Sequence, residues 1–132
     1  MCNILLISHS HELAKANYDF VNEMKQKDFK LDYVGGLEDG KEFGTNPMTI
    51  FAKLDELIKT NSGVLIIYDL GSSLLNAKSA IEMFEAEESK NKIAYADVAF
   101  VEGALAAVCS NNEEMTPTQL KQIIEQQCKV TK

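Results

Sequence analysis

Hydrophobic positions along the chain fall into two alternating patterns. Short, uninterrupted apolar runs are typical of strands that are buried on both faces of a parallel sheet. Between these runs, apolar residues recur every three or four positions, which is the spacing of a helix with one buried face. The runs that predict strands cover residues 4–7, about 31–34, 64–68 and, more weakly, about 92–100.

Five helices are predicted between and after these strands. Asn46-Pro47 and Thr116-Pro117 each place a capping side chain directly before a proline in the first turn of a helix. Val101-Glu102-Gly103 opens an alanine-rich helix that runs to about Cys109. The residues expected on the buried faces of the other helices are Leu13, Ala16, Phe20, Val21 and Met24, then Ile50, Phe51, Leu54, Leu57 and Ile58, then Leu74, Ala77, Ile81 and Phe84, and finally Leu120, Ile123 and Ile124.

The alternation of strands and helices predicts an α/β fold. We expect a three-layer sandwich with a central, mainly parallel sheet of strand order 2-1-3-4, room for an extra edge strand, and helices on both faces. The whole chain, residues 1–132, is expected to be one domain. Ligands of such folds bind beyond the carboxyl ends of the strands, which meet at one edge. The segments predicted to lie at that edge cover residues 8–11, 35–45, 69–73 and 100–103.

Charge and composition narrow the classes of partner. The formal net charge is −7 and the sequence pI is about 4.8, which argues against nucleic acid or an anionic membrane as a partner. No apolar run approaches the ~20 residues of a membrane span, and the first residues lack the basic start of a signal peptide. The three cysteines form no CxxC motif, so we expect reduced, partly buried thiols and no zinc site. A cytoplasmic protein is the resulting expectation.

Histidine chemistry is confined to the end of the first strand. His9 and His11 are the chain's two histidines. An imidazole can act as a base, a metal ligand or a nucleophile near neutral pH. His9 directly follows the buried strand and is therefore the candidate reactive residue. His11 is expected to enter the helix that follows and to be a bystander.

Polar groups from two other segments are predicted to surround His9. Asp69 ends the strand next to the first one, where its carboxylate could orient the imidazole by accepting a hydrogen bond; it could also cap the following helix. Gly71-Ser72-Ser73 leads into that helix, so its N–H groups and hydroxyls could hold an anion, and Thr45 could add to them. This combination indicates phosphoryl chemistry, although the chain has no Walker lysine motif and no GxGxxG.

Four motifs of the chain resemble, in order and spacing, those of a known family. They are Ser8-His9-Ser10, Gly35-Gly36 with Gly44-Thr45, Asp69-Leu70-Gly71-Ser72 and Val101-Glu102-Gly103-Ala104. The family is the mannose-type EIIA domain of DhaM, the phosphotransferase subunit of phosphoenolpyruvate-dependent dihydroxyacetone kinases. The resemblance covers residue 1 to about residue 110. Ala16 and Ala99 depart from it, because a glycine and a proline are frequent at these positions.

The resemblance implies a phosphocarrier. The histidine that matches His9 takes a phosphoryl group from phospho-HPr and passes it to ADP on the DhaL subunit, and DhaK then presents dihydroxyacetone. The resemblance also implies a homodimer, and no tightly bound cofactor, with ADP, ATP and Mg held by the partner subunit. The residues that the motifs place around the phosphate or the partner are Ser10, Gly35, Gly36, Thr45, Gly71, Ser72, Ser73, Glu102 and Gly103.

Three alternatives remain open from the sequence. The EIIA domain of a mannose-family sugar transporter differs only in its partners; such domains carry a His-Gly pair after the first strand, where this chain has His9-Ser10. A metal-dependent hydrolase could use His9, His11 and Asp69, but the chain has no third histidine. A non-enzymatic regulatory module of flavodoxin or receiver type would need more glycine or an acidic cluster after the first strand.

Overall fold

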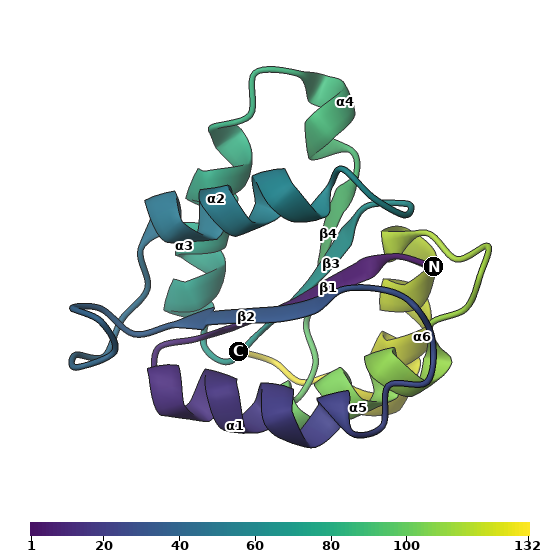
Figure 1. Ribbon diagram of the computed structural model, residues 1–132, viewed down its shortest axis with the longest axis horizontal. Coiled ribbons are helices and arrows are strands. Elements are labelled where there is room, and N and C mark those ends of the chain that lie inside the picture. Colours follow the sequence, from purple (N-terminus) through teal and green to yellow (C-terminus); the bar gives the residue numbers. More distant parts are fainter.

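The centre of the structure, a computed structural model that describes residues 1–132, is a four-stranded sheet (Figure 1). All three strand pairings are parallel and the strand order is β2-β1-β3-β4, as predicted. β1 and β3 occupy the middle of the sheet and are buried along their whole length, which explains their uninterrupted apolar sequences. The strands are β1 (Asn3–Ser8), β2 (Leu31–Gly35), β3 (Val64–Tyr68) and β4 (Ile93–Ala96).

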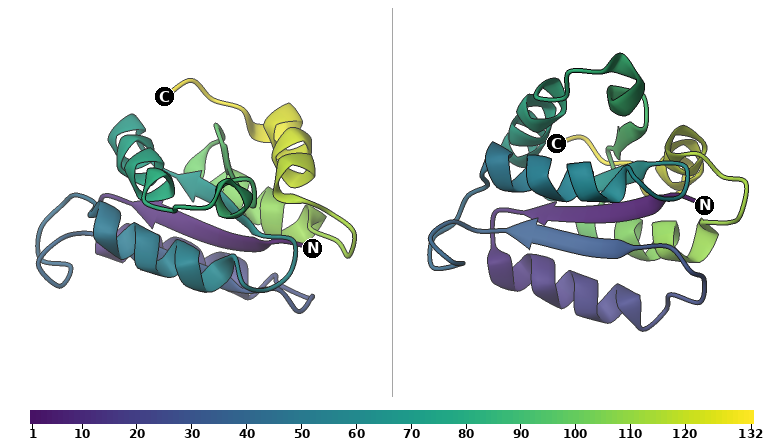
Figure 2. Two further views of the ribbon diagram at one scale, coloured as in Figure 1. Left: turned by 90° about the horizontal axis from the view of Figure 1, so that it is seen from above. Right: turned by 45° about the horizontal axis from the view of Figure 1, so that its top comes forward.

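Helices cover both faces of the sheet, which gives the predicted three layers (Figure 2). One hydrophobic core lies between the sheet and α1, α5 and α6, and a second lies between the sheet and α2 and α3. None of the helices combines the length and the apolar character that a bilayer-spanning helix needs. The helices are α1 (His11–Asn22), α2 (Pro47–Leu57), α3 (Gly71–Glu82), the short α4 (Glu87–Lys90), α5 (Phe100–Ser110) and α6 (Pro117–Cys128).

The predicted fourth strand is shorter than expected. β4 ends at Ala96 because the next N–H group, that of Asp97, donates to the side chain of Glu125 and leaves the sheet ladder. The following helix already begins at Phe100, before Val101. The extra edge strand is reduced to a single antiparallel bridge between Val98 and Lys129.

The buried face of α1 also differs from the prediction. Ala14, Asn17 and Val21 are buried, and the Nδ2 group of Asn17 donates to the carbonyl of Phe100 in α5. The helix is therefore rotated by about one residue, since small and polar side chains fit between α1 and α5 better than large apolar ones. The apolar residues that this rotation exposes are called the α1 stripe below: Leu13, Ala16, Phe20 and Met24.

The other predicted core positions are confirmed as buried or half-buried. Both predicted caps are present, because Asn46 accepts the N–H of Met48 and Thr116 accepts that of Gln119. The expectation for the cysteines is wrong in one case. Cys2 is buried and Cys128 is half-buried, but Cys109 is exposed, and all three are free thiols.

Candidate functional site

His9 lies at the carboxyl edge of the sheet, between the end of β1 and the start of α1. Its backbone N–H donates to Oδ2 of Asp69 at 2.9 Å. Ser8, before it, donates its hydroxyl to the same oxygen, and Ser10, after it, caps α1 by accepting the N–H of Leu13. Both neighbours of His9 are thus fixed by hydrogen bonds, so the backbone that carries the imidazole is held in place.

The structure places the carboxylate of Asp69 beside the imidazole of His9. Its Oδ1 lies 3.2 Å from Nδ1 of His9. The same carboxylate accepts hydrogen bonds from the N–H of Leu70 at 2.7 Å and from the hydroxyl of Ser73 at 2.7 Å. Burial alone would raise the pKa of Asp69, but the hydrogen bonds from His9, Ser73, Ser8 and Leu70 outweigh it and lower the pKa below its usual value. The carboxylate is therefore ionised at neutral pH.

Two serines of α3 complete the surroundings of the ring. The hydroxyl oxygen of Ser73, which is fully buried, lies 2.9 Å from Nδ1 of His9. With an ionised Asp69 beside it, Nδ1 carries the proton. Nε2 then carries no proton. Its lone pair faces the hydroxyl of Ser72, which lies 2.5 Å away on the exposed side of the ring. The arrangement offers Nε2 as a nucleophile.

The first turn of α3 provides an anion-binding position next to Nε2. The helix begins at Gly71 after Leu70, whose side chain makes no capping hydrogen bond. The first N–H groups of the helix therefore have no side-chain acceptor, and the helix dipole adds partial positive charge there. A Cβ atom at Gly71 would meet nothing within 4 Å, so the space above this turn is open. An anion on Nε2 could be held there.

The loop after β2 approaches His9 from the other side. Gly44 donates its N–H to the carbonyl of His9 at 2.8 Å. Thr45, next to it, accepts hydrogen bonds from Asn76 of α3 through both its carbonyl and its hydroxyl. The loop thereby ties α3 to the start of α1, but no direct hydrogen bond joins Thr45 to His9.

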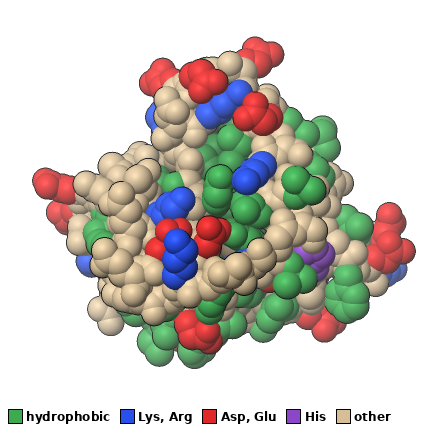
Figure 3. All heavy atoms as spheres, turned by 180° about the vertical axis from the view of Figure 1, so that it is seen from behind, with side chains coloured by type: hydrophobic (Ala, Val, Ile, Leu, Met, Phe, Trp, Pro, Cys, Tyr) green, Lys and Arg blue, Asp and Glu red, His purple; other side chains and the backbone are tan.

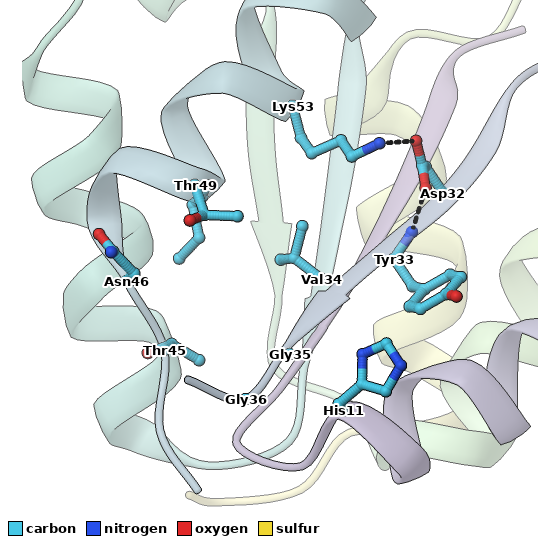
Figure 4. Close-up of a pocket in the computed structure, with 11 residues that line it drawn as sticks. His11, Asp32, Tyr33, Val34, Gly35, Gly36, Thr45, Asn46, Thr49 and Lys53 are labelled. Carbon is cyan, nitrogen blue, oxygen red and sulfur yellow. Dashed lines mark hydrogen bonds and ion pairs between the residues drawn. The ribbon is translucent and has the colours of Figure 1, made fainter. Parts of the chain in front are cut away.

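Gly35, Gly36 and Thr45, which the sequence assigns to the surroundings of the phosphate or the partner, line a cavity of their own. The cavity has a volume of about 340 Å³ and lies beside β2, where His11, Asp32 and Lys53 also line it (Figure 4). His9, Asp69, Ser72 and Ser73 are not among its lining residues. The predicted site residues therefore fall into two groups, one around His9 and one around this cavity.

His11 belongs to this cavity. Its side chain supports the glycine loop: a Cβ atom at Gly40, whose φ is +85°, would come within 3.0 Å of the imidazole. Its ring also packs against Tyr33, with 5.9 Å between the centroids. No group of three histidine, cysteine or acidic side chains in the structure could hold a metal ion together.

The motif after β4 contributes to packing. Gly103 is buried in α5, and a Cβ atom there would lie 2.3 Å from Cγ2 of Val98. Glu102 is exposed in the first turn of the same helix. Neither residue hydrogen-bonds to His9, Asp69, Ser72 or Ser73. The close contact between α5 and the segment after β4 explains the glycine.

Sequence reasoning missed the role of Ser8, which holds both Asp69 and the N–H of Ser10. The signal was available, since Ser8 is the one polar residue at the end of a fully buried run. It also missed Asn76, and the exposed apolar side chains of Phe43 and Leu70, which neighbour Gly44 and Gly71. Loop positions of this kind carry no periodic pattern that could reveal them.

Family and sequence comparisons are consistent with this geometry. The EIIA-man family model, described as the PTS system fructose IIA component, matches residues 3–123. A phosphoryl donor subunit DhaM of the PEP-dependent dihydroxyacetone kinase 2 of Listeria innocua is 32% identical over 108 residues, which is 81% of this chain and 83% of that protein. The DhaM of kinase 1 from the same organism is 35% identical over 64% of each chain. DhaM of Escherichia coli is 30% identical over 83% of this chain, but the match spans 23% of that longer protein.

Two solved structures share the fold. A crystal structure of a protein of unknown function, EF1359, has a TM-score of 0.80 with 27% identity, and the match covers 98% of this chain and 96% of that one. The mannose/sorbose specific IIA subunit of the phosphotransferase system from Enterococcus faecalis has a TM-score of 0.60 with 19% identity, over 95% and 87% of the two chains. The second likeness concerns the fold alone.

Proposed function

The chain belongs to the EIIA-man family of the phosphotransferase system, and from that premise we propose that it is a phosphocarrier subunit of a dihydroxyacetone kinase. In this proposal residues 1–132 form one EIIA domain, and His9 takes up a phosphoryl group and passes it on. The observation that carries the proposal is the imidazole of His9 at the sheet edge, with Nδ1 beside the Asp69 carboxylate and Nε2 facing the exposed hydroxyl of Ser72. The names of the DhaM relatives support the kinase as the system served.

The transfer step uses the lone pair of Nε2. It attacks the phosphorus atom of a phosphohistidine on the donor, so that an N–P bond forms on His9 while the N–P bond of the donor breaks. The electron pair of the broken bond stays on the donor's imidazole. Asp69 accepts a hydrogen bond from the Nδ1–H group of His9 throughout and stabilises the positive charge that the ring gains during the attack.

The phosphoryl group is then held at the start of α3. The hydroxyl of Ser72 lies next to Nε2, and the N–H groups of Gly71 and Ser72 at the start of the helix add further donors for the group. Donors that are already in place before the transfer need no reorganisation when charge arrives.

We assign phospho-HPr as the donor and ADP on DhaL, with its Mg ion, as the acceptor; DhaK binds the dihydroxyacetone that is finally phosphorylated. A site without a surrounding cavity suits this role, because two different proteins must reach the same nitrogen in turn. The negative net charge of the chain suits basic docking surfaces on both.

The experiment that tests the proposal starts from labelled phosphoenolpyruvate, enzyme I and HPr. We expect the chain to become labelled, and the label to be lost in acid and retained in base, as for phosphohistidine. Addition of DhaL with ADP should then move the label to ATP. Acid-stable label or no label would refute the phosphocarrier role, and transfer to a sugar-transporter subunit but not to DhaL would assign the chain to the transport branch.

Exposed apolar side chains around His9 predict where the partners dock. Phe43 is 82% exposed and Leu70 is 57% exposed, and both lie within two residues of groups that hold His9 or border Nε2. Figure 3 shows one face of the molecule, on which hydrophobic side chains lie beside a histidine side chain. Burial of such side chains is a typical source of affinity between proteins.

We expect Phe43→Ser and Leu70→Ala each to lower the second-order rate constant of transfer from phospho-HPr by about five- to fiftyfold. Thermal unfolding should not change, because neither side chain is part of the core. Leu75→Ser, at an equally exposed position further along α3, is the matched control and should transfer normally. Unchanged rates in both docking variants would place the partner contacts elsewhere.

The α1 stripe predicts the contact surface of the homodimer. Leu13, Phe20 and Met24 are each more than 40% exposed, and Val101 and Cys109 of α5 are exposed alongside them. The helix has an acidic residue, Glu12, at its start and Lys25 and Lys27 beyond its end. A second copy that packs antiparallel about a twofold axis would pair these opposite charges, which is why we propose a second copy as the occupant.

We expect the wild-type chain to have twice its monomer mass in light scattering and Phe20→Asp to have the monomer mass. The variant should stay folded, since Phe20 is 48% exposed and contributes little to the core. Glu23→Gln, next to the stripe but outside it, is the control and should remain dimeric. A monomeric wild-type chain, or a dimeric Phe20→Asp, would show that the stripe does not form this interface.

A further inference from the structure

The C-terminal tail brings a lysine to the edge of the sheet where His9 lies. After α6, the tail runs antiparallel to the segment that follows β4, with hydrogen bonds from Ala99 N–H to the carbonyl of Cys128 and from Val130 N–H to that of Asp97. These bonds direct the last residues toward the end of β3, and the C-terminus lies close to α3 (Figures 1 and 2). The tail therefore has a fixed course.

Along this course, the side chain of Lys132 reaches Tyr68, the residue before Asp69. Its ammonium group donates to the carbonyl of Tyr68 and lies 3.9 Å from the centroid of the Tyr68 ring. Partial burial lowers the pKa of Lys132, and the carboxylates of Asp69 and Asp97 act against that change. The ammonium group is thus one peptide unit from Asp69, and Lys132 is an exposed residue with a long, flexible side chain.

No other cation is placed in this way. The chain contains no arginine, and all 13 of its basic residues are lysines. Five of the other lysines form ion pairs away from the site, with Asp19, Asp32, Asp55, Glu82 or Glu87, and Glu125. The groups that touch the ring of His9 are two hydroxyls and one carboxylate.

Phosphorylation of His9 adds negative charge at a site where no cation touches the ring. A phosphoryl group adds about two negative charges at neutral pH, next to the carboxylate of Asp69. The phosphoryl group and the Asp69 carboxylate repel each other because both are negative, and the N–H donors of α3 carry only partial positive charges. A flexible ammonium group at the same edge can offset this repulsion when it moves toward the phosphoryl oxygens.

We propose that Lys132 is the cation of the phosphoryl site. Its ammonium group binds the Tyr68 carbonyl in the unphosphorylated protein and pairs with the phosphoryl group once His9 is phosphorylated. This role rests on the phosphocarrier function proposed above. It stabilises the phosphorylated form relative to the free form, so it sets the equilibrium between phospho-His9 and phospho-HPr. The transfer nucleophile and its orientation do not depend on it.

The test measures that equilibrium. Wild-type protein, Lys132→Met, Lys132→Arg and the control Lys129→Met are each mixed with phospho-HPr, and the label on both proteins is quantified at equilibrium. We expect Lys132→Met to shift the equilibrium constant about tenfold toward phospho-HPr, Lys132→Arg to stay within about threefold of wild type, and Lys129→Met to match wild type. The ³¹P resonance of phospho-His9 should also move in Lys132→Met alone.

An equilibrium constant of Lys132→Met equal to that of Lys129→Met would overturn the proposal, whatever the melting temperatures are. A shift in Lys132→Met that arginine does not restore would also overturn it, because a cation role requires only the charge and the reach. If the wild-type protein takes up no label at all, the phosphocarrier function itself fails, and this inference fails with it. If the proteins take up label but wild type and Lys132→Met reach the same equilibrium constant, only the role of Lys132 is refuted.

Discussion

His9→Ala loses all phosphoryl uptake from phospho-HPr, whereas His11→Ala keeps most of it. This is the largest effect we expect, because the first change removes the nucleophilic Nε2 and leaves no other imidazole beside the start of α3. His11 lies in the neighbouring cavity, where it packs against Tyr33 and the glycine loop. The measurement is label transferred from phosphoenolpyruvate through enzyme I and HPr, with both variants at the same concentration.

The control for this comparison is folding. His9 is only partly buried and its imidazole contacts polar groups, so His9→Ala should melt within a few degrees of wild type. His11→Ala should loosen the loop at Gly40 and cost at most about threefold in the rate of transfer. Equal loss in both variants would point to a paired or metal-linked site, and the assignment of Nε2 of His9 as the nucleophile would then be wrong.

The sheet could be predicted from the sequence because its two central strands are buried on both faces. Such strands are apolar at every position, so a run like 64–68 differs clearly from the helical spacing on either side of it. The juxtaposition of His9 and Asp69 followed from the same information, since it needs only the strand order and the shared edge. What lies at the carboxyl ends of parallel strands is the most predictable part of this fold.

The α1 stripe shows where such reasoning fails. Leu13, Phe20 and Met24 have helical spacing and were assigned to the core, yet the structure buries Asn17 instead. A hydrogen bond from Asn17 to the carbonyl of Phe100 makes that polar residue compatible with burial. Periodicity alone cannot distinguish a core face from an interface face, because both are apolar and both repeat every three to four residues.

The course of the loop and of the tail could not be predicted either. Gly44 reaches His9, and Lys132 reaches Tyr68, through single hydrogen bonds between segments far apart in the sequence. Neither contact belongs to a repeating pattern. The sequence therefore predicts the candidate reactive side chain and the carboxylate beside it, while the neighbouring loop and tail contacts come from the structure.

The second large effect is expected for Asp69→Asn, which should slow transfer through His9 at least tenfold. The amide keeps the shape of the carboxylate but removes the charge that holds the proton on Nδ1 and stabilises the imidazolium formed during transfer. Stability should fall as well. If Asp69 only capped α3, asparagine would replace it with little loss, because both residues cap helices about equally well. The carboxylate accepts from four donors besides the ring, those of Ser8, His9, Leu70 and Ser73, and an asparagine offers one oxygen to them.

Loss of these bonds should cost about 1–3 kcal/mol, a drop of several degrees in melting temperature. The loss should depend on pH. Because the pKa of Asp69 is lowered in the folded protein, its contribution to stability is present above the pKa of the unfolded chain, about 3.9, and disappears as pH falls through the folded value. The difference in melting temperature between wild type and Asp69→Asn should therefore shrink below about pH 4.

Ser8→Ala separates the two roles of Asp69. It removes one hydrogen bond to the carboxylate and one to the N–H of Ser10, but leaves the contact between Asp69 and Nδ1 of His9. We expect it to lower the melting temperature and to keep transfer within about threefold of wild type, measured well below the melting transition of each variant. If Asp69→Asn behaves in the same way, with a lower melting temperature and a normal transfer rate, then the carboxylate serves only to hold the turn and some other group fixes the proton on Nδ1.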